Sequence, residues 1–238
     1  MPNNKSTRRG YTDTDELEFS YNSLITLRKA QEEIYWLLNR GYPIKNAVTF
    51  VGNHYLLSNR QRLALTRATA PADSIIARKA KEITLCDNQI IGIDGFNIII
   101  TLEVALSGSL LIKCMDGTIR DLAGLRGTYR LIDATDTAIL LIGDKLKSIN
   151  TARTVFYLDA PVSNSGRLKT RIFKLLENHG FSISVELINN VDTCLKNKSY
   201  VVTSDAIILN ECESWINIAE SIISEKINDA KPIELNNF

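Results

Sequence analysis

Histidine and cysteine are scarce in this chain, which has 2 histidines and 4 cysteines among its 238 residues. No two cysteines form a C-x-x-C pair, which argues against a zinc site and against a disulfide framework. Cys86 and Cys114 lie in or beside apolar runs, and we expect both to be buried thiols. The histidines, His54 and His179, are far apart in the sequence, so a histidine-based zinc or triad mechanism has little support.

Long apolar runs and nucleotide-binding loops are also missing. No run approaches the length that crosses a bilayer, and residues 1–10 are polar and basic, so we expect no signal peptide and no membrane partner. There is no P-loop and no G-x-G-x-x-G motif, which argues against a nucleotide cofactor. Together these absences predict a soluble, reduced protein of the cytoplasm.

The chain also lacks a strong net charge, because its formal net charge is only +1. That average conceals an asymmetry, because residues 40–81 contain one acid, Asp73, among many bases. The bases of this stretch are Arg40, Lys45, Arg60, Arg62, Arg67, Arg78, Lys79 and Lys81. Two interpretations stay open: the stretch contacts an anionic polymer, or it forms ordinary solvated helix faces.

The first third of the chain has apolar residues at helical spacing and predicts a small all-helical domain over residues 16–82. Residues 1–15 are polar and predict a mobile arm. Gly41 and Pro43 end the first helix, and Ala70-Pro71-Ala72 ends the helical run. The expected helices span residues 20–40, 44–54 and 59–69, with a short helix or connector over 73–81.

Residues 83–238 alternate between strand-like and helix-like segments, which predicts an α/β domain with a mostly parallel sheet in three layers. The expected strands span residues 89–93, 154–158, 181–187 and 200–203, and the expected helices span 97–106, 132–149, 166–179 and 212–227. Asp116-Gly117 predicts a hairpin between residues 110 and 120, with Asp116 as a turn residue only.

Three aspartates, Asp94, Asp159 and Asp205, each follow the end of an expected strand. The carboxyl ends of parallel strands open onto one crevice, and carboxylates that converge there repel each other unless a cation lies between them. The pattern therefore predicts a site for Mg²⁺ or Mn²⁺ and phosphate chemistry. The alternative is that each aspartate only caps the helix that follows it.

Neighbouring residues support the metal interpretation. Asn97 can ligate or donate a hydrogen bond at the start of the next helix, and Thr203 and Ser204 can orient a carboxylate or a water. Gly95 lets the backbone turn sharply and lets a ligand approach.

The stretch Ile93-Asp94-Gly95-Phe96-Asn97 resembles the D-G-x-N signature of the NYN branch of PIN-like nucleases. Leu158-Asp159 resembles the second acid of that superfamily, and Thr203-Ser204-Asp205 resembles its T-S-D segment. The resemblance covers roughly residues 85–225 and implies a PIN-like, Rossmann-like fold. The chain is also similar to an uncharacterised prokaryotic family that pairs a small helical domain with a PIN-like one. The segments that carry this second similarity are 37–43, 105–108 and 120–124.

The PIN-like resemblance implies a metal-dependent ribonuclease with Asp94, Asp159 and Asp205 as catalytic metal ligands. PIN enzymes usually have a further acid on a helix between the first and second aspartates, and no clear motif supplies it here. The candidates for this fourth acid are Glu103, Asp121, Asp133 and Asp136. The hypothesis from another class is a PIN-like module that has lost catalysis and serves RNA binding or assembly, with homo-oligomer formation left open.

Contacts with RNA are expected from two regions. The loop with Ser163, Ser165 and Arg167 enters a helix N-terminus and can bind a substrate phosphate, or its polar residues only cap that helix. The basic residues expected to track the RNA backbone are Arg40, Lys45, Arg60, Arg62, Arg126 and Arg130. Among the nearby aromatic residues we expect Trp36 in the helical core, while Tyr42 and Tyr55 can either pack or stack on bases.

Overall fold

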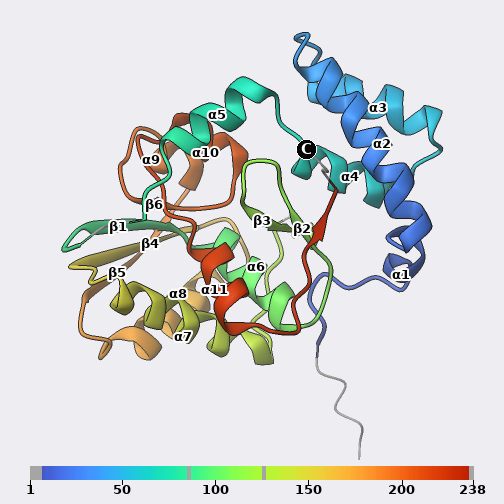
Figure 1. Cartoon of the computed structure of the whole chain (residues 1–238). Coiled ribbons are helices and arrows are strands. Elements are labelled where there is room, and N and C mark those ends of the chain that lie inside the picture. Colours follow the sequence, from blue (N-terminus) through green and yellow to red (C-terminus); the bar gives the residue numbers. More distant parts are fainter. Residues whose placement is uncertain (1–6, 85–86, 125–126, 236–238) are drawn as a thin grey trace, which may run out of the picture.

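The computed structural model describes residues 7–84, 87–124 and 127–235, in which a helical unit precedes an α/β unit (Figure 1). Residues 15–68 of the helical unit lie to one side of the larger unit, residues 72–80 lie against the larger unit, and a short hairpin lies between the two units. Cys86 and Arg126 lie outside the described residues.

The α/β unit is built on a sheet of four strands in the order β5-β4-β1-β6. These strands are β1 (Ile90–Asp94), β4 (Arg153–Asp159), β5 (Ser182–Ile188) and β6 (Val201–Val202). Every neighbouring pair is parallel. The carboxyl ends of all four strands therefore meet at one edge of the sheet, here called the carboxyl edge, where ligands bind in open α/β folds.

Helices cover both faces of this sheet, so the unit has three layers (Figure 1). Successive side chains of a strand point to opposite faces. In β4, Phe156 and Leu158 belong to one core, whereas Val155 and Tyr157 belong to another. The first core includes α6 (Gly95–Leu106), α7 (Asp133–Ser148), α8 (Ser165–Leu176) and α11 (Ile218–Lys226), and the second includes α9 (Val191–Leu195) and α10 (Ala206–Glu211). The predicted α/β class with a parallel sheet is confirmed.

The helical unit contains the helices that the apolar spacing predicted. They are α2 (Tyr21–Leu38), α3 (Ile44–His54), α4 (Asn59–Ala68) and α5 (Ala72–Ala80), preceded by the single turn α1 (Asp15–Glu18). Ser58 starts α4 with a capping box, because its hydroxyl accepts the Gln61 N–H at 3.1 Å and the Gln61 side chain accepts the Ser58 N–H at 3.0 Å.

A second, three-stranded sheet joins the two units. The predicted hairpin is confirmed as β2 (Leu111–Lys113) paired antiparallel with β3 (Ile119–Asp121), and β7 (Ile233–Glu234) adds a parallel strand that the sequence did not reveal. Ile112 and Leu235 pack in the same core as α2, α3 and α4. The helical unit therefore depends on the rest of the chain to complete its core.

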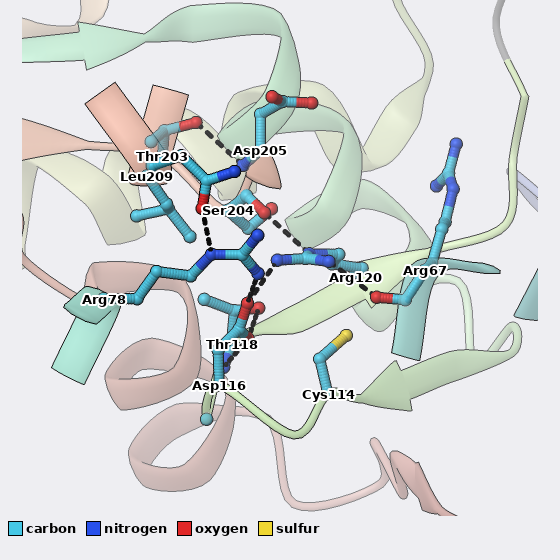
Figure 2. A network of polar contacts seen from close by, with 12 residues as sticks. Arg67, Arg78, Cys114, Asp116, Thr118, Arg120, Thr203, Ser204, Asp205 and Leu209 are labelled. Carbon is cyan, nitrogen blue, oxygen red and sulfur yellow. Dashed lines mark hydrogen bonds and ion pairs between the residues drawn. The ribbon is translucent and has the colours of Figure 1, made fainter. Parts of the chain in front are cut away.

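A buried ion triad also joins the units. Asp116 has an exposed fraction of 1 %, and its Oδ2 accepts hydrogen bonds from Arg78 at 2.7 Å and from Arg120 at 2.6 Å (Figure 2). Its Oδ1 accepts the Thr118 hydroxyl at 2.6 Å. Burial alone raises the pKa of Asp116, but the two guanidinium charges and the Thr118 hydroxyl outweigh it and hold that pKa below its ordinary value. The expectation that Asp116 serves only as a turn residue is therefore wrong.

Arg120 extends this triad toward the carboxyl edge. Its Nε donates to the Ser204 carbonyl at 2.7 Å, and its Nη1 donates to the Arg67 carbonyl at 2.6 Å (Figure 2). Arg78 in turn donates to the Asn210 side chain at 2.8 Å. Arg120 thus ties α4 and the hairpin to the loop between β6 and α10, and Asp116 links Arg120 to Arg78 of α5.

Residues 8–10 pack against the α/β unit and Asp15 pairs with Arg60 of α4, whereas residues 1–15 were expected to form a mobile arm. Arg8 donates to the Gly108 carbonyl at 3.0 Å, and Arg9, which is 8 % exposed, forms an ion pair with Glu103 of α6. Glu103 is fully buried, although a glutamate on a helix is solvent-exposed in most proteins. A buried carboxylate requires a partner, and the arm supplies one.

Trp36 is 53 % exposed, so its predicted place in the helical core is wrong. The buried face of α2 includes Ile34 and Leu38, and a residue two positions from Ile34 points about 200° away on a helix. The guanidinium of Arg40 lies 3.4 Å from the centroid of the Trp36 ring.

The single helix predicted for residues 212–227 is also wrong at its start. The chain is not helical at Trp215, which forms bridges with Glu82 and Val201, and α11 begins only at Ile218. Trp215 is fully buried, and its indole N–H donates to the Arg78 carbonyl at 2.7 Å. A buried indole needs such an acceptor, which the extended path provides.

We expect Asp116→Asn to lower the free energy of unfolding by about 3 kcal/mol, because it leaves two buried guanidinium groups without their counter-charge. Urea denaturation measures the loss. The matched control is Asp136→Asn, which removes a surface pair with Arg171 and should cost less than about 1 kcal/mol. Equal losses in the two variants would contradict the prediction.

The stability difference between wild type and Asp116→Asn should also depend on pH. Because the folded pKa of Asp116 lies below the ordinary value of 3.8, its stabilisation is complete above that value and disappears as the pH falls through the folded pKa. The difference in stability between wild type and Asp116→Asn should stay constant from pH 7 to pH 5 and shrink below about pH 4. A difference that grows in acid would refute this sign.

Gly95→Ala should destabilise the protein by about 1–3 kcal/mol, because an added Cβ would lie 2.6 Å from the Leu158 side chain and 3.1 Å from the Tyr157 carbonyl. The control is Gly166→Ala in α8, where the added Cβ would have no heavy atom of another described segment within 4 Å. That variant should gain about 0.5 kcal/mol from a less flexible unfolded chain. Thermal and urea unfolding distinguish the two, and a neutral Gly95→Ala would disprove the close contact between α6 and β4.

Candidate functional site

The three predicted aspartates all lie at the carboxyl edge of the parallel sheet. Asp94 is the last residue of β1, and Asp159 is the last residue of β4. Asp205 follows the end of β6 and is the N-cap of α10. Because β4, β1 and β6 are neighbours in the sheet, the strand order itself brings these carboxylates together.

A fourth carboxylate, Asp192, lies at the same edge. It belongs to α9, which starts just after the end of β5. Burial raises the pKa of Asp192, and the negative charges of Asp205 and Asp159 raise it further, while Lys196 opposes them. Asp94, Asp159, Asp192 and Asp205 are here called the acidic cluster, with one member from the end of each strand.

Asp94 is the buried centre of this acidic cluster. Its exposed fraction is 7 %, and no basic residue is among the causes of its shifted pKa. Burial raises the pKa of Asp94 to about 7, with further contributions from the charges of Asp205 and Asp192 and an opposing hydrogen bond from Thr203. The cluster thus contains more negative charge than the protein itself compensates.

The hydroxyl of Thr203 connects two of the acids. It donates to Asp94 Oδ2 at 2.9 Å and accepts the backbone N–H of Asp205 at 3.0 Å. Ser204 next to it donates both its N–H and its hydroxyl to Asn97 Oδ1, each at 2.8 Å. The three predicted supporting residues therefore fix the β6–α10 loop against the start of α6.

Gly95 contributes through packing. It is the first residue of α6, directly after the end of β1, so the chain changes direction there without a positive φ. Its missing Cβ also allows α6 to approach Leu158 and Tyr157 of β4, which places Asp94 and Asn97 beside the neighbouring strand.

Helix capping and cation binding are both compatible with these side chains. Asp205 Oδ1 accepts the N–H groups of Ile207 at 2.7 Å and Ile208 at 3.3 Å, so Asp205 does cap α10. Asp159 Oδ1 accepts the Val191 N–H at 3.3 Å. The Oδ2 atoms of Asp159 and Asp205 accept no hydrogen bond from the described residues, and carboxylate oxygens of this kind suit Mg²⁺ or Mn²⁺.

The spacing of the acids limits this fit. Within the described ranges, no group of three or more His, Cys, Asp or Glu side chains is close enough to hold a metal ion directly. A divalent ion would therefore have to bind through waters or draw the carboxylates together. Mg²⁺ retains several waters in protein sites, which makes the first arrangement chemically reasonable.

The four residues considered for the fourth acid have other environments. Glu103 contacts Arg9 and Tyr129, and Asp121 accepts hydrogen bonds from Thr101 and the Ala123 N–H. Asp136 pairs with Arg171, and Asp133 is exposed at the start of α7. The sequence contained the signal for Asp192, since this residue also follows an expected strand.

The expected phosphate loop uses its serines internally. The Ser163 hydroxyl accepts the Tyr129 N–H at 2.9 Å, and the Ser165 hydroxyl donates to the Ala160 carbonyl at 3.3 Å. Arg167 is exposed and lines a cavity of about 400 Å³ together with Arg130. An anion at this cavity would therefore contact the guanidinium groups of Arg130 and Arg167 and not the serine hydroxyls.

The basic residues expected to contact RNA differ in whether their side chains already pair within the protein. Arg60 pairs with Asp15 and donates to the Gly10 carbonyl at 2.7 Å, and Arg62 donates to the Leu57 carbonyl at 2.9 Å. Lys45 and Arg130 are exposed, and Arg40 stacks on Trp36. We assign Arg60 and Arg62 to intramolecular contacts, and Arg40, Lys45 and Arg130 stay predictions.

Arg67, one of the bases of residues 40–81, and Arg120 line a groove beside the acidic cluster. This groove has a volume of about 510 Å³ and lies between α4, α6 and β3. Its polar lining residues include Arg67, Asn97, Arg120, Asp121 and Asp205. Figure 2 shows Arg67 and Arg120 on the hairpin side of Asp205. The groove, here called the inter-unit groove, connects the helical unit to the carboxyl edge.

Comparisons with other proteins identify relatives without an assigned activity. In the described part of the chain, no helix is both long and apolar enough to pass through a bilayer. No solved structure matches the chain. An uncharacterised protein of Methanocaldococcus jannaschii is 37% identical over 187 residues, which cover 78% of this chain and 89% of that relative.

Two families divide the chain between them. Residues 26–81 match the family described as Protein of unknown function (DUF434), which corresponds to α2 through α5. All four members of the acidic cluster lie within residues 83–221, which match the family described as Domain of unknown function (DUF5616). The chain therefore belongs to the family of proteins with a DUF5616 domain.

Proposed function

We propose that this protein is a metal-dependent nuclease that hydrolyses phosphodiester bonds of RNA at the acidic cluster. The observation that carries the proposal is the convergence of Asp94, Asp159, Asp192 and Asp205 at the carboxyl edge of a parallel sheet. Carboxylates that raise each other's pKa at a ligand-binding edge attract divalent cations. The order Asp94, Asp159, Asp205 also supports the resemblance to the NYN branch of PIN-like nucleases.

The residues of the acidic cluster would divide the chemistry between them. When bound, Mg²⁺ or Mn²⁺ supplies Lewis-acid stabilisation of the phosphate and an acidified water. The free oxygens of Asp159 and Asp205 would hold the ion, directly or through waters, and Asp94 and Asp192 would add negative charge to its site. Thr203 keeps Asp94 and Asp205 in their relative positions through its two hydrogen bonds.

The second candidate is a PIN-like module that binds RNA or assembles without catalysis. The spacing of the acids favours it, because the described residues contain no three acids close enough to hold a metal ion directly. The capping bonds of Asp205 provide a structural reason for this residue without any metal. The two candidates differ in whether a divalent ion binds and whether RNA is cut.

Metal binding can be measured without activity. We expect Mn²⁺ to raise the midpoint of thermal unfolding of the wild type, because an ion that binds only the folded state stabilises it. In Asp94→Asn this increment should disappear, while the metal-free protein becomes no less stable because a buried, repelled charge is gone. An equal Mn²⁺ increment in both proteins would show that the ion binds elsewhere.

Cleavage is tested with labelled single-stranded and structured RNA in Mn²⁺ and in chelator. We expect cleavage only with the metal and a loss of at least about tenfold in Asp94→Asn and Asp192→Asn. Asp133→Asn is the matched control, because this exposed acid lies outside the cluster, and it should keep wild-type activity.

Cleavage that is insensitive to the chelator and to Asp94→Asn would refute the nuclease proposal. RNA binding without cleavage, in any divalent metal, would support the second candidate.

A further inference from the structure

We infer that the inter-unit groove binds the phosphodiester backbone of a single-stranded polynucleotide, with Arg67 of the helical unit and the Asn97 amide as its donors. This inference deepens the proposed function and rests on it for the location of the scissile bond. It gives the helical unit a direct role at the site, because one wall of the groove comes from α4.

The position of the inter-unit groove supports this occupant. Its lining includes Asp205 and Asn97 of the carboxyl edge together with Thr66 and Arg67 of α4. Its volume of about 510 Å³ is in the range of small-ligand sites, which suits a nucleotide unit of a strand. A strand in the groove would therefore pass directly beside the acidic cluster.

Arg67 has unused hydrogen-bond donors in this groove. Its side chain is 31% exposed, and its Nη1 bonds to the carbonyl and carboxylate of Asp121. Its Nε and Nη2 make no hydrogen bond to any described residue, and a guanidinium with free N–H groups suits a phosphate. The Asp121 contact holds the side chain in place while these donors stay available.

Asn97 supplies the second donor. The Ser204 backbone N–H can only donate, so the Asn97 atom that receives it at 2.8 Å must be the carbonyl oxygen. The Nδ2 amide is thereby assigned to the other side, and it makes no hydrogen bond to the described residues. Asn97 is half-buried and lines the groove, so its amide donates toward a ligand there.

Arg120 has a different role although it also lines the groove. Each of its three guanidinium nitrogens already donates, to Ser204, Arg67 and Asp116. It is therefore a positioning residue that fixes the Ser204 carbonyl and the Arg67 backbone at the two walls. The charge available to a phosphate comes from Arg67.

The test measures binding of fluorescent oligo(U) and oligo(dT) 12-mers by anisotropy in chelator, where the proposed metal-dependent hydrolysis cannot occur. We expect Arg67→Gln to weaken binding about five- to tenfold and to lower the salt slope by about 0.7, the value for one lost contact with a single strand. The two oligonucleotides distinguish an RNA strand from a DNA strand that presents the same phosphates.

The matched control is Arg153→Gln. Arg153 is exposed at the first residue of β4, at the opposite edge of the sheet, so its loss should leave affinity and slope unchanged. Equal affinities and slopes for Arg67→Gln and Arg153→Gln would overturn the inference, as would a wild type that binds neither oligonucleotide.

A second variant covers the case in which Arg67→Gln loosens the hairpin. Thr66 is exposed and lines the groove, so Thr66→Glu adds a negative charge there without changing a buried contact, and it should also weaken binding. Cross-links from 4-thiouridine oligonucleotides should map to residues 64–68 or 204–207. Cross-links confined to other segments would overturn the inference.

The two proposals can fail separately. Binding that depends on Arg67 without any cleavage would keep the groove and remove the nuclease. Metal-dependent cleavage with binding that ignores both Arg67→Gln and Thr66→Glu would keep the nuclease and remove the groove.

Discussion

The ion triad of Arg78, Asp116 and Arg120 is the contact on which the arrangement of the two units depends. It joins α5 and the hairpin to the Ser204 carbonyl, one residue from Asp205. A buried carboxylate flanked by two guanidinium groups adds little net stability but is costly to break, so such a triad favours specificity of arrangement. The helical unit is thereby held beside the carboxyl edge, and the groove between them has defined walls.

Charge is compensated differently in this triad and in the acidic cluster. Within the triad, Asp116 is compensated by two arginines, and its pKa is lowered despite burial. In the acidic cluster, Asp94 is buried with Asp205 and Asp192 nearby, and its pKa rises to about 7. An aspartate thus stabilises the contact between the units at one place, whereas the charge of another aspartate is left uncompensated. Natural proteins accept such local destabilisation mainly where a ligand relieves it.

Local patterns predicted much of the fold and part of the site. Apolar alternation and the Asp-Gly turn located the strands and the hairpin, and strand ends located Asp94, Asp159 and Asp205. The same rule extended to β5 would have identified Asp192. Trp36 was assigned to the core wrongly, because it lies off the buried face of an otherwise amphipathic helix. The helix predicted for residues 212–227 starts too early, because the buried indole of Trp215 needs a hydrogen-bond acceptor that an extended chain provides.

The amino-acid sequence alone determined the α/β class, the parallel order of elements and three of the four acids, because these follow from local periodicity and chain order. Only the tertiary structure decided that Asp116 is an ion-pair centre, that Arg9 pairs with Glu103, and that Arg67 and Asp205 line one groove. The ion pairs of Asp116 with Arg78 and of Glu103 with Arg9 join residues that are far apart in the sequence, and their energies depend on burial and charge, which no sequence window contains.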